Sequence, residues 1–375
     1  MDVAVVGGGA VGVTVAHDLA ETADVTLYEA EELGSGASGR AAGLCYAAYS
    51  DRRDAALARR ALERLRDLSG SGGFTFESSP YVWLAREPTD GSRADGDELV
   101  TEIREQAARM REHGLDVATL DAAELGERFP RIAAGNVAVA AVAEDAGYAD
   151  PSAYTDTMGL LARANGATIE EGTPAKLTAD GRVETDAGVH EYDAVVVAAG
   201  AHTRAVVESV APLPVKPYRV QALVTEPVDV TPPMLFDATG GFYLRPHEEG
   251  VLVGDGTEPV EQDPDDWDAA ADESFREACI EYQERALGWS WPEKRSWAGL
   301  CTATPDGDPL VGELADGVYV ATGWQGHGFM RAPAVAERLA AQVRGDGDPI
   351  AGFDPCRFDG DESFEIVEGM VVERR

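Results

Sequence analysis

Three glycines near the start of the chain have the spacing of a turn that binds a dinucleotide. They stand at positions 7, 9 and 12, directly after the apolar run Asp2–Val6. The first glycine allows a tight turn, the second lets backbone approach a pyrophosphate, and the third lets a helix pack closely on the strand. Glu29 ends the next strand-like run, where its carboxylate can accept hydrogen bonds from both ribose hydroxyls. We therefore predict a dinucleotide site, with a purely structural glycine turn as the alternative.

A second loop of small residues follows over 34–44, with the sequence GSGASGRAAGL. Its backbone N–H groups and serine hydroxyls can reach a pyrophosphate that the first turn already holds. A plain nicotinamide-dependent dehydrogenase does not need this second loop. The pair of loops therefore disfavours that class of enzyme.

A third group of residues suited to chemistry lies towards the end of the chain. The string GVYVATGWQGHGFMRAP (317–333) predicts a strand over 318–322, a glycine loop, and a helix over 332–343. The N–H groups at the start of a helix present a positive dipole end. Such a helix end stabilises negative charge that develops on an electron-accepting ring.

Taken in order, these motifs resemble the FAD-dependent amino-acid and amine oxidoreductases, which include D-amino-acid oxidase, glycine oxidase, sarcosine oxidase and dimethylglycine dehydrogenase. The strings AEDAGYADPSAY (143–154) and WAGL (297–300) add to the likeness. The resemblance implies an α/β fold, in which a Rossmann-like FAD-binding domain is interleaved with a second α+β substrate domain built on a mixed, mostly antiparallel sheet. The expected boundaries are 1–73, 148–212 and 299–375 for the FAD-binding domain, and 74–147 and 213–298 for the substrate domain.

The resemblance also implies which residues contact FAD. They are Gly7, Gly9, Ala10, Val11, Gly12, Glu29, Ala30, Ser35, Ser38, Gly39, Arg40, Ala42, Gly43, Leu44, Ala175, Ala199, Gly200, Gly323, Gly326, His327, Gly328, Phe329 and Met330. Two relatives link the flavin covalently, sarcosine oxidase through a cysteine that aligns with Gly299 and dimethylglycine dehydrogenase through a histidine that aligns with Arg40. Neither linking residue is present, so we expect noncovalent FAD.

Five residues are candidates for work on the substrate, and one of them, Cys301, is described with the departures below. Tyr243 lies in a hairpin-like string (241–258) and matches the family's active-site tyrosine, although a half-buried strand tyrosine is the alternative. Arg245 either binds a substrate carboxylate bidentately or stabilises the hairpin. His327 is either a proton-handling neighbour of the flavin or a backbone spacer. Arg331 is a weaker candidate for binding a carboxylate.

The departures from the family pattern concern substrate and electron acceptor. Cys301 stands where glycine and D-amino-acid oxidases carry a carboxylate-binding arginine, and a thiol cannot replace a guanidinium fork. The oxygen-activating and carboxylate-binding lysines of sarcosine oxidase align with Leu252 and Met330. Without these cations, a dehydrogenase that uses another electron acceptor is expected as readily as an oxidase.

The family chemistry is removal of a hydride from the carbon beside an amine nitrogen, which leaves an imine that hydrolyses. We therefore predict an FAD-dependent oxidoreductase acting on a small amine or amino acid, with secondary or N-methylated amino acids favoured. An FAD-dependent 2-hydroxy-acid dehydrogenase and a flavoprotein subunit of a larger electron-transfer complex remain as alternatives.

The composition limits the partners and the surroundings. The 375 residues carry a formal net charge of −37, which repels nucleic acid and anionic lipid. The acids are spread along the chain, including an expected acidic, largely helical excursion over Asp263–Leu287. This pattern is typical of a protein that stays hydrated at high ionic strength, and we predict a halophilic, cytoplasmic protein.

Metal sites, disulfides and membrane spans are not expected. The four cysteines are widely spaced without a C-x-x-C pair, and the six histidines lack ligand spacing. No apolar run reaches the 18 or so residues of a membrane span, and the chain begins directly with a strand rather than a basic leader.

Overall fold

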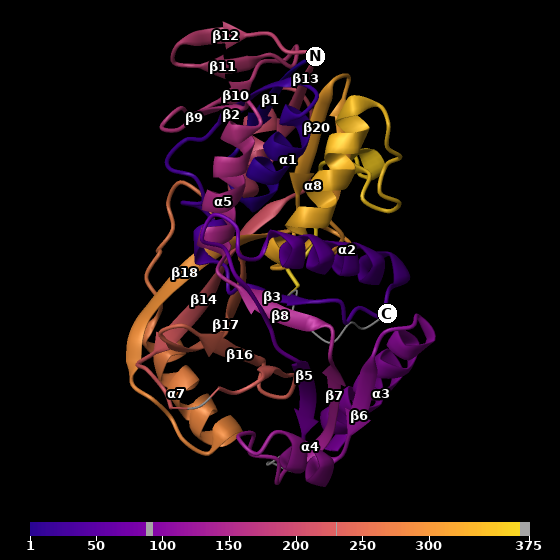
Figure 1. Cartoon of the computed structure of the whole chain (residues 1–375), viewed down its shortest axis with the longest axis vertical. Coiled ribbons are helices and arrows are strands. Elements are labelled where there is room, and N and C mark those ends of the chain that lie inside the picture. The colour runs from indigo at the N-terminus through magenta and orange to yellow at the C-terminus, as the bar shows by residue number, and fades with distance from the viewer. Residues whose placement is uncertain (88–92, 230, 368–375) are drawn as a thin grey trace.

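The computed structural model describes residues 1–87, 93–229 and 231–367. It contains two large sheets, stacked one above the other in Figure 1 with a small sheet between them. The upper sheet has six strands and the lower sheet has eight.

The six-stranded sheet is parallel apart from one edge strand. In spatial order its strands are β19 (Leu310–Ala315), β20 (Val318–Thr322), β13 (Ala194–Val197), β1 (Asp2–Val6), β2 (Asp24–Tyr28) and β9 (Thr168–Glu170). Only β19 runs antiparallel to its neighbour. The central strands are buried on both faces, which explains why their sequences are almost wholly apolar.

Small residues allow three helices to pack closely on this sheet. Helix α1 (Ala10–Ala20) contacts both α5 (Pro151–Ala164) and α8 (Gly328–Arg344), and α8 also packs against α2 (Arg52–Leu68). Helix α5 starts sharply because the Asp150 carboxylate caps it and proline occupies its first position. The first turn of α8 lies near the carboxyl end of β20, because only residues 323–327 separate the two elements.

The eight-stranded sheet is antiparallel except where β15 pairs with β5. In spatial order its strands are β18 (Glu293–Ala303), β14 (Lys216–Thr225), β17 (Gly250–Glu261), β16 (Phe242–His247), β15 (Met234–Asp237), β5 (Tyr81–Arg86), β7 (Val137–Ala143) and β6 (Val117–Leu120). Helices on the same half of the molecule are α3 (Arg93–Glu112), α4 (Ala122–Arg128) and α7 (Glu273–Leu287). The predicted mixed, mostly antiparallel sheet and the two-part α/β fold are confirmed.

Two three-stranded sheets complete the fold. One joins the halves and contains β3 (Leu44–Tyr46), β8 (Ala146–Ala149) and β4 (Phe76–Ser78). The other extends from the upper half and contains β10 (Lys176–Leu177), β11 (Val183–Thr185) and β12 (Gly188–His190). Short helical turns are η1 (Ser38–Arg40), η2 (Gly200–His202), α6 (Thr203–Val207) and η3 (Pro355–Arg357).

The elements expected from the sequence are largely present. The string 241–258 forms the hairpin β16–β17 as predicted. The acidic excursion Asp263–Leu287 is helical only from Glu273, because residues 262–272 are fixed by side chains of the neighbouring sheet instead. Among the described residues, no helix is both long and apolar enough to cross a membrane.

Candidate functional site

The turn after β1 has no room for side chains. A Cβ at Gly12 would lie 1.9 Å from the carbonyl oxygen of Gly7. Gly7 itself has a φ of 108°, and its Cβ would lie 2.5 Å from the carbonyl oxygen of Ala198, beside Ala199. Glycine is therefore required at both positions for the backbone to turn and for helix α1 to start against the strand. The result is an open cradle of backbone at the amino end of α1.

The second loop of small residues meets this cradle. Ser38 Oγ accepts a hydrogen bond of 2.9 Å from the backbone N–H of Ala10, the first residue of α1. The backbone N–H of Gly34 donates to the carbonyl of Gly8 at 3.1 Å. Gly39 follows Ser38, and its N–H donates to Gly34 at 2.7 Å. The structure thus places the two predicted loops side by side at one helix N-terminus, where a pyrophosphate can bind.

Glu29 lies at the carboxyl end of β2 and faces the same turn. Its Oε2 accepts a hydrogen bond of 2.6 Å from the N–H of Gly8, and its Oε1 accepts one of 3.0 Å from Glu31. These bonds hold the carboxylate at the edge of the cradle, as expected for a group that receives ribose hydroxyls.

The other predicted cofactor residues surround the cradle and lead away from it. Ala175 and Ala199 pack on the core cluster that contains Tyr28, and the carbonyl of Gly200 accepts from Thr322 at 3.4 Å. Gly43 must be glycine because its Cβ would lie 2.0 Å from the carbonyl oxygen of Ala149. The remaining predicted cofactor residues lie in or beside these elements. They are Gly9 and Val11 at the start of α1, Ala30 and Ser35 after β2, Arg40 at the end of η1, Ala42 after it, and Leu44 at the start of β3.

The loop between β20 and α8 has an unusual backbone. Gln325 has a φ of 46°, the only positive value at a non-glycine residue in the described ranges, and it stands between Gly323 (φ 77°) and Gly326 (φ 79°). Backbone strain of this kind collects at functional sites. The Oε1 of Gln325 is buried and has no hydrogen-bond partner among the described residues. Thr302, on β18, holds the loop through hydrogen bonds from Gly323, Trp324 and Gln325.

A buried aromatic cluster lies at the start of α8. His327 Nε2 is 3.2 Å from the hydroxyl of Tyr46, and the hydroxyl of Tyr49 donates to Met330 Sδ at 3.0 Å. The ring of Tyr81 stacks on that of Tyr46 with centroids 4.2 Å apart. Phe329 and Gly328 complete the first turn of α8, with Phe329 packed edge-on against Tyr154. The residues predicted to lie beside the flavin therefore form one group with Tyr46, at the end of β3, and Tyr49, just after it.

This group is uncharged at neutral pH. Burial, reinforced by the positive charge of Arg331, lowers the pKa of His327 to about 3. Burial, with the neighbouring tyrosines Tyr81 and Tyr49, raises the pKa of Tyr46 well above its usual value. His327 can therefore donate or accept a hydrogen bond, but it is too weak a base to take a proton from an ammonium group.

Arg331 lies behind the cluster and is balanced by an acid. It is 6% exposed, its guanidinium lies 5.0 Å from the ring centroid of Tyr49, and its Nη2 is 3.5 Å from Asp54 Oδ1. Burial lowers the pKa of Arg331, but Tyr49 and Asp54 outweigh that effect and raise it. The Nε of Arg331 has no hydrogen-bond partner among the described residues.

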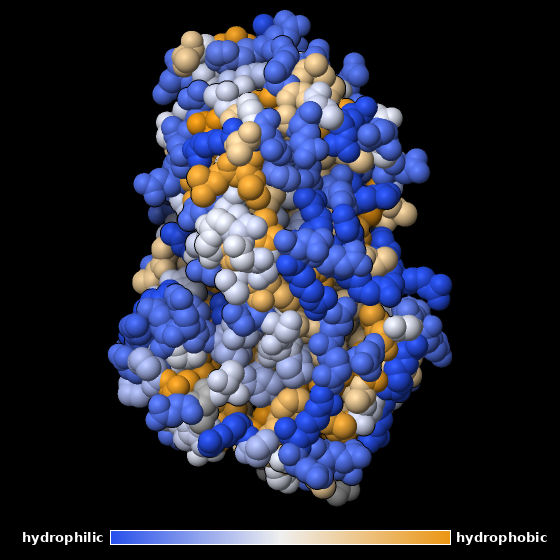
Figure 2. All heavy atoms as spheres, viewed as in Figure 1, coloured by the Kyte–Doolittle hydropathy of each residue, from blue (hydrophilic) through white to orange (hydrophobic). Residues whose placement is uncertain are grey.

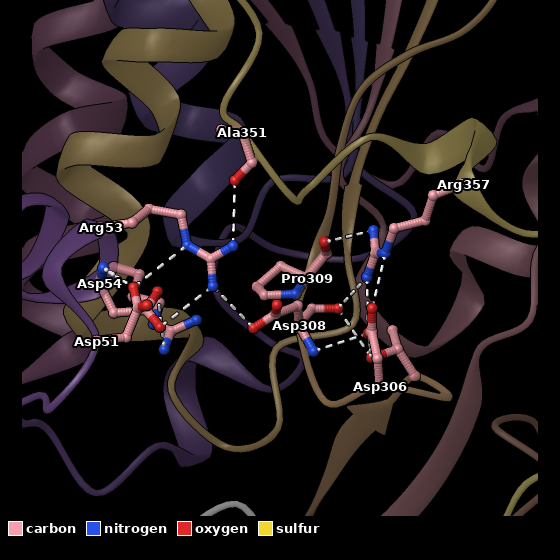
Figure 3. A network of polar contacts seen from close by, with 10 residues as sticks. Asp51, Arg53, Asp54, Asp306, Asp308, Pro309, Ala351 and Arg357 are labelled. Atoms are coloured by element: carbon pink, nitrogen blue, oxygen red, sulfur yellow. Dashed lines mark hydrogen bonds and ion pairs between the residues drawn. The ribbon is translucent and has the colours of Figure 1, made fainter. Parts of the chain in front are cut away.

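Asp54 belongs to a larger polar network that joins distant segments (Figure 3). Arg53 approaches Asp54 at 3.5 Å, Asp308 at 3.1 Å and the carbonyl of Ala351 at 3.1 Å. On the far side of the same loop, Arg357 pairs with Asp306 at 2.8 Å. The network fixes the start of α2 and the loop after β18. It thereby holds Asp54 beside Arg331, which packs against Tyr49 of the aromatic cluster.

Tyr243 and Arg245 lie on β16, in the other half of the molecule. The ring of Tyr243 covers Gly254, where a Cβ would lie 1.9 Å from its Cζ. Arg245 donates its Nε to the carbonyl of Ala42 and its Nη1 to that of Pro246. Its guanidinium thus connects the hairpin to the second small-residue loop, and burial lowers its pKa to about 10.

Cys301 lies near the end of β18, where it pairs with Tyr218 of β14. Burial raises the pKa of its thiol to about 11, so it remains protonated at neutral pH. A neutral thiol does not offer a substrate carboxylate a charged partner. No group of histidine, cysteine and acidic residues capable of holding a metal ion occurs within the ranges that the structure describes.

Sequence reasoning missed Tyr46, Tyr49, Tyr81 and Asp54. A signal for the first two was present, since they follow the second small-residue loop directly in the string GLCYAAYSD (43–51). Tyr81 and Asp54 carry no local signal, because their roles depend on contacts between segments far apart in the chain.

Comparisons with known proteins agree with this geometry. The family model described as FAD dependent oxidoreductase (DAO) matches residues 2–342. The chain is 28% identical to 4-methylaminobutanoate oxidase (formaldehyde-forming) of Paenarthrobacter nicotinovorans and 26% identical to mitochondrial dimethylglycine dehydrogenase of Homo sapiens, over 95% and 98% of its length. It spans only 44% and 46% of the lengths of these two relatives.

Among solved structures, L-proline dehydrogenase from P. horikoshii is similar over 95% of this chain and 97% of that one, with a TM-score of 0.84 and 27% identity. The match to the family model covers both large sheets and the start of α8. The chain therefore belongs to the FAD dependent oxidoreductases of the DAO family.

Proposed function

We propose that the protein oxidises a small amine or amino acid, with secondary or N-methylated amino acids favoured. When bound, FAD supplies the acceptor for a hydride from the carbon beside the substrate nitrogen, and the resulting imine hydrolyses in water. Close packing at Gly7 and Gly12 lets the backbone turn into the amino end of α1, where Ser38 joins the second loop, and such a helix end fits the pyrophosphate of a dinucleotide. The Oε1 of Gln325 is buried and has no hydrogen-bond partner within the described part of the chain, which fits a polar group of a ligand beside that loop.

The uncharged cluster at the start of α8 favours oxidation of an amine over oxidation of a hydroxy acid. Oxidation of a neutral amine needs no proton to be removed first, because the nitrogen lone pair is already free. Oxidation of a hydroxy acid needs a base for the hydroxyl proton, and a histidine with a pKa of about 3 is poorly suited to that task. His327 and Tyr46 can orient an amine by hydrogen bonds without adding charge.

The test is anaerobic bleaching of the bound flavin's visible absorbance by a panel of amines, N-methyl amino acids, proline and 2-hydroxy acids in molar KCl. We expect a secondary or N-methylated amino acid to bleach it fastest. Faster bleaching by hydroxy acids would replace the amine proposal. If no compound bleaches the flavin, the protein would instead be an electron-transfer subunit.

Substrate contacts are assigned within this proposal. Arg331 acts through Tyr49 and Asp54 or binds a carboxylate directly, while Arg245 holds the loop through Ala42. Tyr243 and Cys301 line the substrate side. A substrate series with and without a carboxylate separates the two roles of Arg331, because only direct binding makes the KM of the carboxylated substrate rise selectively in Arg331→Met.

We propose the domain boundaries given above, and sheet membership supports them. All strands of the six-stranded sheet fall within 1–73, 148–212 and 299–375, although residues 368–375 lie outside the described part of the chain. The eight-stranded sheet falls within 74–147 and 213–298, apart from the last residues of β18. The sheet of β3, β8 and β4 crosses the boundary and joins the domains.

FAD is held without a covalent bond in this proposal. The two positions at which relatives attach the flavin, Arg40 and Gly299, face each other, since a Cβ at Gly299 would lie 3.2 Å from that of Arg40. Neither residue is a nucleophile that could attach a flavin. Acid precipitation should therefore release all of the yellow colour into the supernatant, and colour retained in the pellet would contradict this assignment.

The electron acceptor is oxygen or an electron-transfer partner. Leu252 is buried on β17 and Met330 contacts Tyr49, so neither position supplies the cation that stabilises superoxide. Peroxide measured per substrate oxidised in air distinguishes the two. A ratio near one identifies an oxidase, and a ratio well below one identifies a dehydrogenase.

We also propose that this is a cytoplasmic protein adapted to high salt. Hydrophilic side chains are spread over the face seen in Figure 2 rather than gathered in one patch, which suits a solvated surface. With a net charge of −37, self-repulsion loosens the fold in dilute buffer, and about 1 M salt reduces the Debye length to roughly 3 Å. The melting temperature should rise between low and molar KCl, and an unchanged value would refute halophily.

A further inference from the structure

One segment of the eight-stranded half lies across two loops assigned to the cofactor. It comprises residues 262–272, between β17 and α7, and is called the strap below. The guanidinium of Arg40 lies 5.6 Å from the ring centroid of Trp267. Asp265 Oδ1 lies 3.2 Å from Nε2 of His202, the last residue of η2. The strap therefore bridges the loop that follows Ser38 and the loop that starts at Gly200.

The strap is anchored rather than loose. Arg219 on β14 has a side chain that is 5% exposed. Its Nε donates to the carbonyl of Asp268 at 2.8 Å, and its Nη1 donates to Asp272 Oδ2 at 3.0 Å. Further bonds go to the carbonyl of Ala270 and the carboxylate of Glu258. One buried guanidinium thus fixes the strap at three places.

The strap is strongly acidic, and the guanidinium of Arg40 presents a positive charge to it. Five of its residues are aspartates, Asp263, Asp265, Asp266, Asp268 and Asp272. A pyrophosphate near α1 would repel this chain of acids unless a cation lay between them.

Arg40 is held in place for that role by both halves of the molecule. Its Nη1 donates to the carbonyl of Ser35, and its own carbonyl accepts from Trp297 Nε1 at 2.9 Å. Ser35 belongs to the cofactor loop, whereas Trp297 lies on β18. Arg40 therefore connects the cofactor loop to β18 through its carbonyl and to the strap through its guanidinium, which lies over Trp267.

We propose that the strap is a clasp that retains noncovalently bound FAD. Trp267 closes over Arg40, and FAD enters or leaves when this contact opens. Trp267 is thus a positioning residue that acts on the cofactor through Arg40. The inference rests on the cofactor role proposed above for the loops, and it adds a determinant of cofactor retention from the other half of the molecule.

The test measures the rate at which FAD leaves the holoenzyme, followed by the fluorescence of released FAD after dilution into molar KCl. Loss of a cation–π contact in Trp267→Ala should accelerate release about three- to tenfold. Trp267→Phe keeps an aromatic face and should release FAD at nearly the wild-type rate. A matched control is Trp289→Ala, because Trp289 makes the same kind of contact with Arg131, at 5.3 Å, away from the cofactor loops.

A second variant approaches the strap without touching Arg40. Arg219→Met removes the anchor and should accelerate FAD release in the same direction as Trp267→Ala. If both variants release FAD at the wild-type rate, the clasp is wrong while the cofactor site stands. If the wild-type protein binds no FAD, the proposed function fails first. Equal acceleration by Trp289→Ala would show general loosening and would also overturn the clasp.

Discussion

The glycine cradle and the aromatic cluster at the start of α8 are built from different materials. At the ends of β1 and β2, the chain presents backbone, with Gly7 and Gly12 in places where a Cβ would collide with neighbouring carbonyls. At the start of α8, it presents large side chains, with His327 against Tyr46 and Met330 against Tyr49. In the first region backbone packs closely on backbone, whereas in the second large side chains pack on one another.

This difference separates what is fixed from what can vary. A backbone cradle is set by sterics, so it suits a ligand that is the same for every member of a family. A cluster of side chains can change one contact at a time, so it suits the choice of substrate. Substitutions in the glycine cradle should therefore abolish FAD binding, and those in the aromatic cluster should alter stability or rate while FAD stays bound.

The largest expected effect comes from filling the cradle. Gly12→Val places side-chain atoms where even a Cβ would lie 1.9 Å from the Gly7 carbonyl oxygen, and overpacking alone costs about 3 kcal/mol. We expect no bound FAD, measured by the flavin absorbance of the purified protein. Gly36→Ala is the control, because its Cβ would meet nothing within 4 Å. Normal FAD content in Gly12→Val would contradict the claim that close backbone packing in the cradle is required for FAD binding.

Breaking the buried ion pair behind the aromatic cluster should have the next largest effect. Asp54→Ala leaves Arg331 as an uncompensated buried charge, which should lower the free energy of unfolding by about 3 kcal/mol. Chemical denaturation in molar KCl measures this change. The double variant Asp54→Ala/Arg331→Met should recover most of the loss. FAD content should stay normal in the folded protein. Loss of FAD would contradict the expectation that substitutions in the aromatic cluster leave FAD bound.

Acid should destabilise the aromatic cluster by protonating His327. Its pKa is lowered to about 3 in the folded protein, so between that value and its ordinary value of 6.5 the unfolded chain binds the extra proton. Stability supplied by the neutral imidazole is complete above pH 6.5 and is lost as the pH falls towards 3. At pH 5 the loss amounts to about 2 kcal/mol from this one group. His327→Gln should therefore lose less stability between pH 8 and pH 5 than the wild type, and equal losses would contradict the assignment.

The smallest effect is expected from one hydroxyl. Tyr46→Phe removes the hydrogen bond to His327 Nε2 and should slow anaerobic flavin reduction by up to about tenfold, since a hydrogen bond contributes roughly 1 kcal/mol. The control is Tyr192→Phe, which removes a similar hydroxyl contact with Tyr28 at 2.7 Å, away from the cluster. An unchanged reduction rate in Tyr46→Phe would remove His327 and Tyr46 from the substrate's surroundings.

The two regions also differ in how far the sequence predicts them. The cradle was predictable because glycine spacing, the following helix and Glu29 lie within 29 residues and act through local backbone geometry. The sheets were predictable from apolar runs and the hairpin string. The contact of Asp54 with Arg331 was not predictable, because 277 residues separate them and no motif links the two residues. The pair matters because both side chains are buried. The strap shows the same limit, since its acids predicted a helix and only Arg219 explains its path.

The order of strands in the six-stranded sheet has a consequence for the making of the protein. Strand β1 leaves the ribosome first, but β13 and β20, which complete the sheet on that side, begin at residues 194 and 318. At roughly 5–20 residues per second, the delay between β1 and β20 is about 15–60 seconds. During that time an apolar strand edge is open to other chains. The sheet therefore stays incomplete on that side until translation has passed β20.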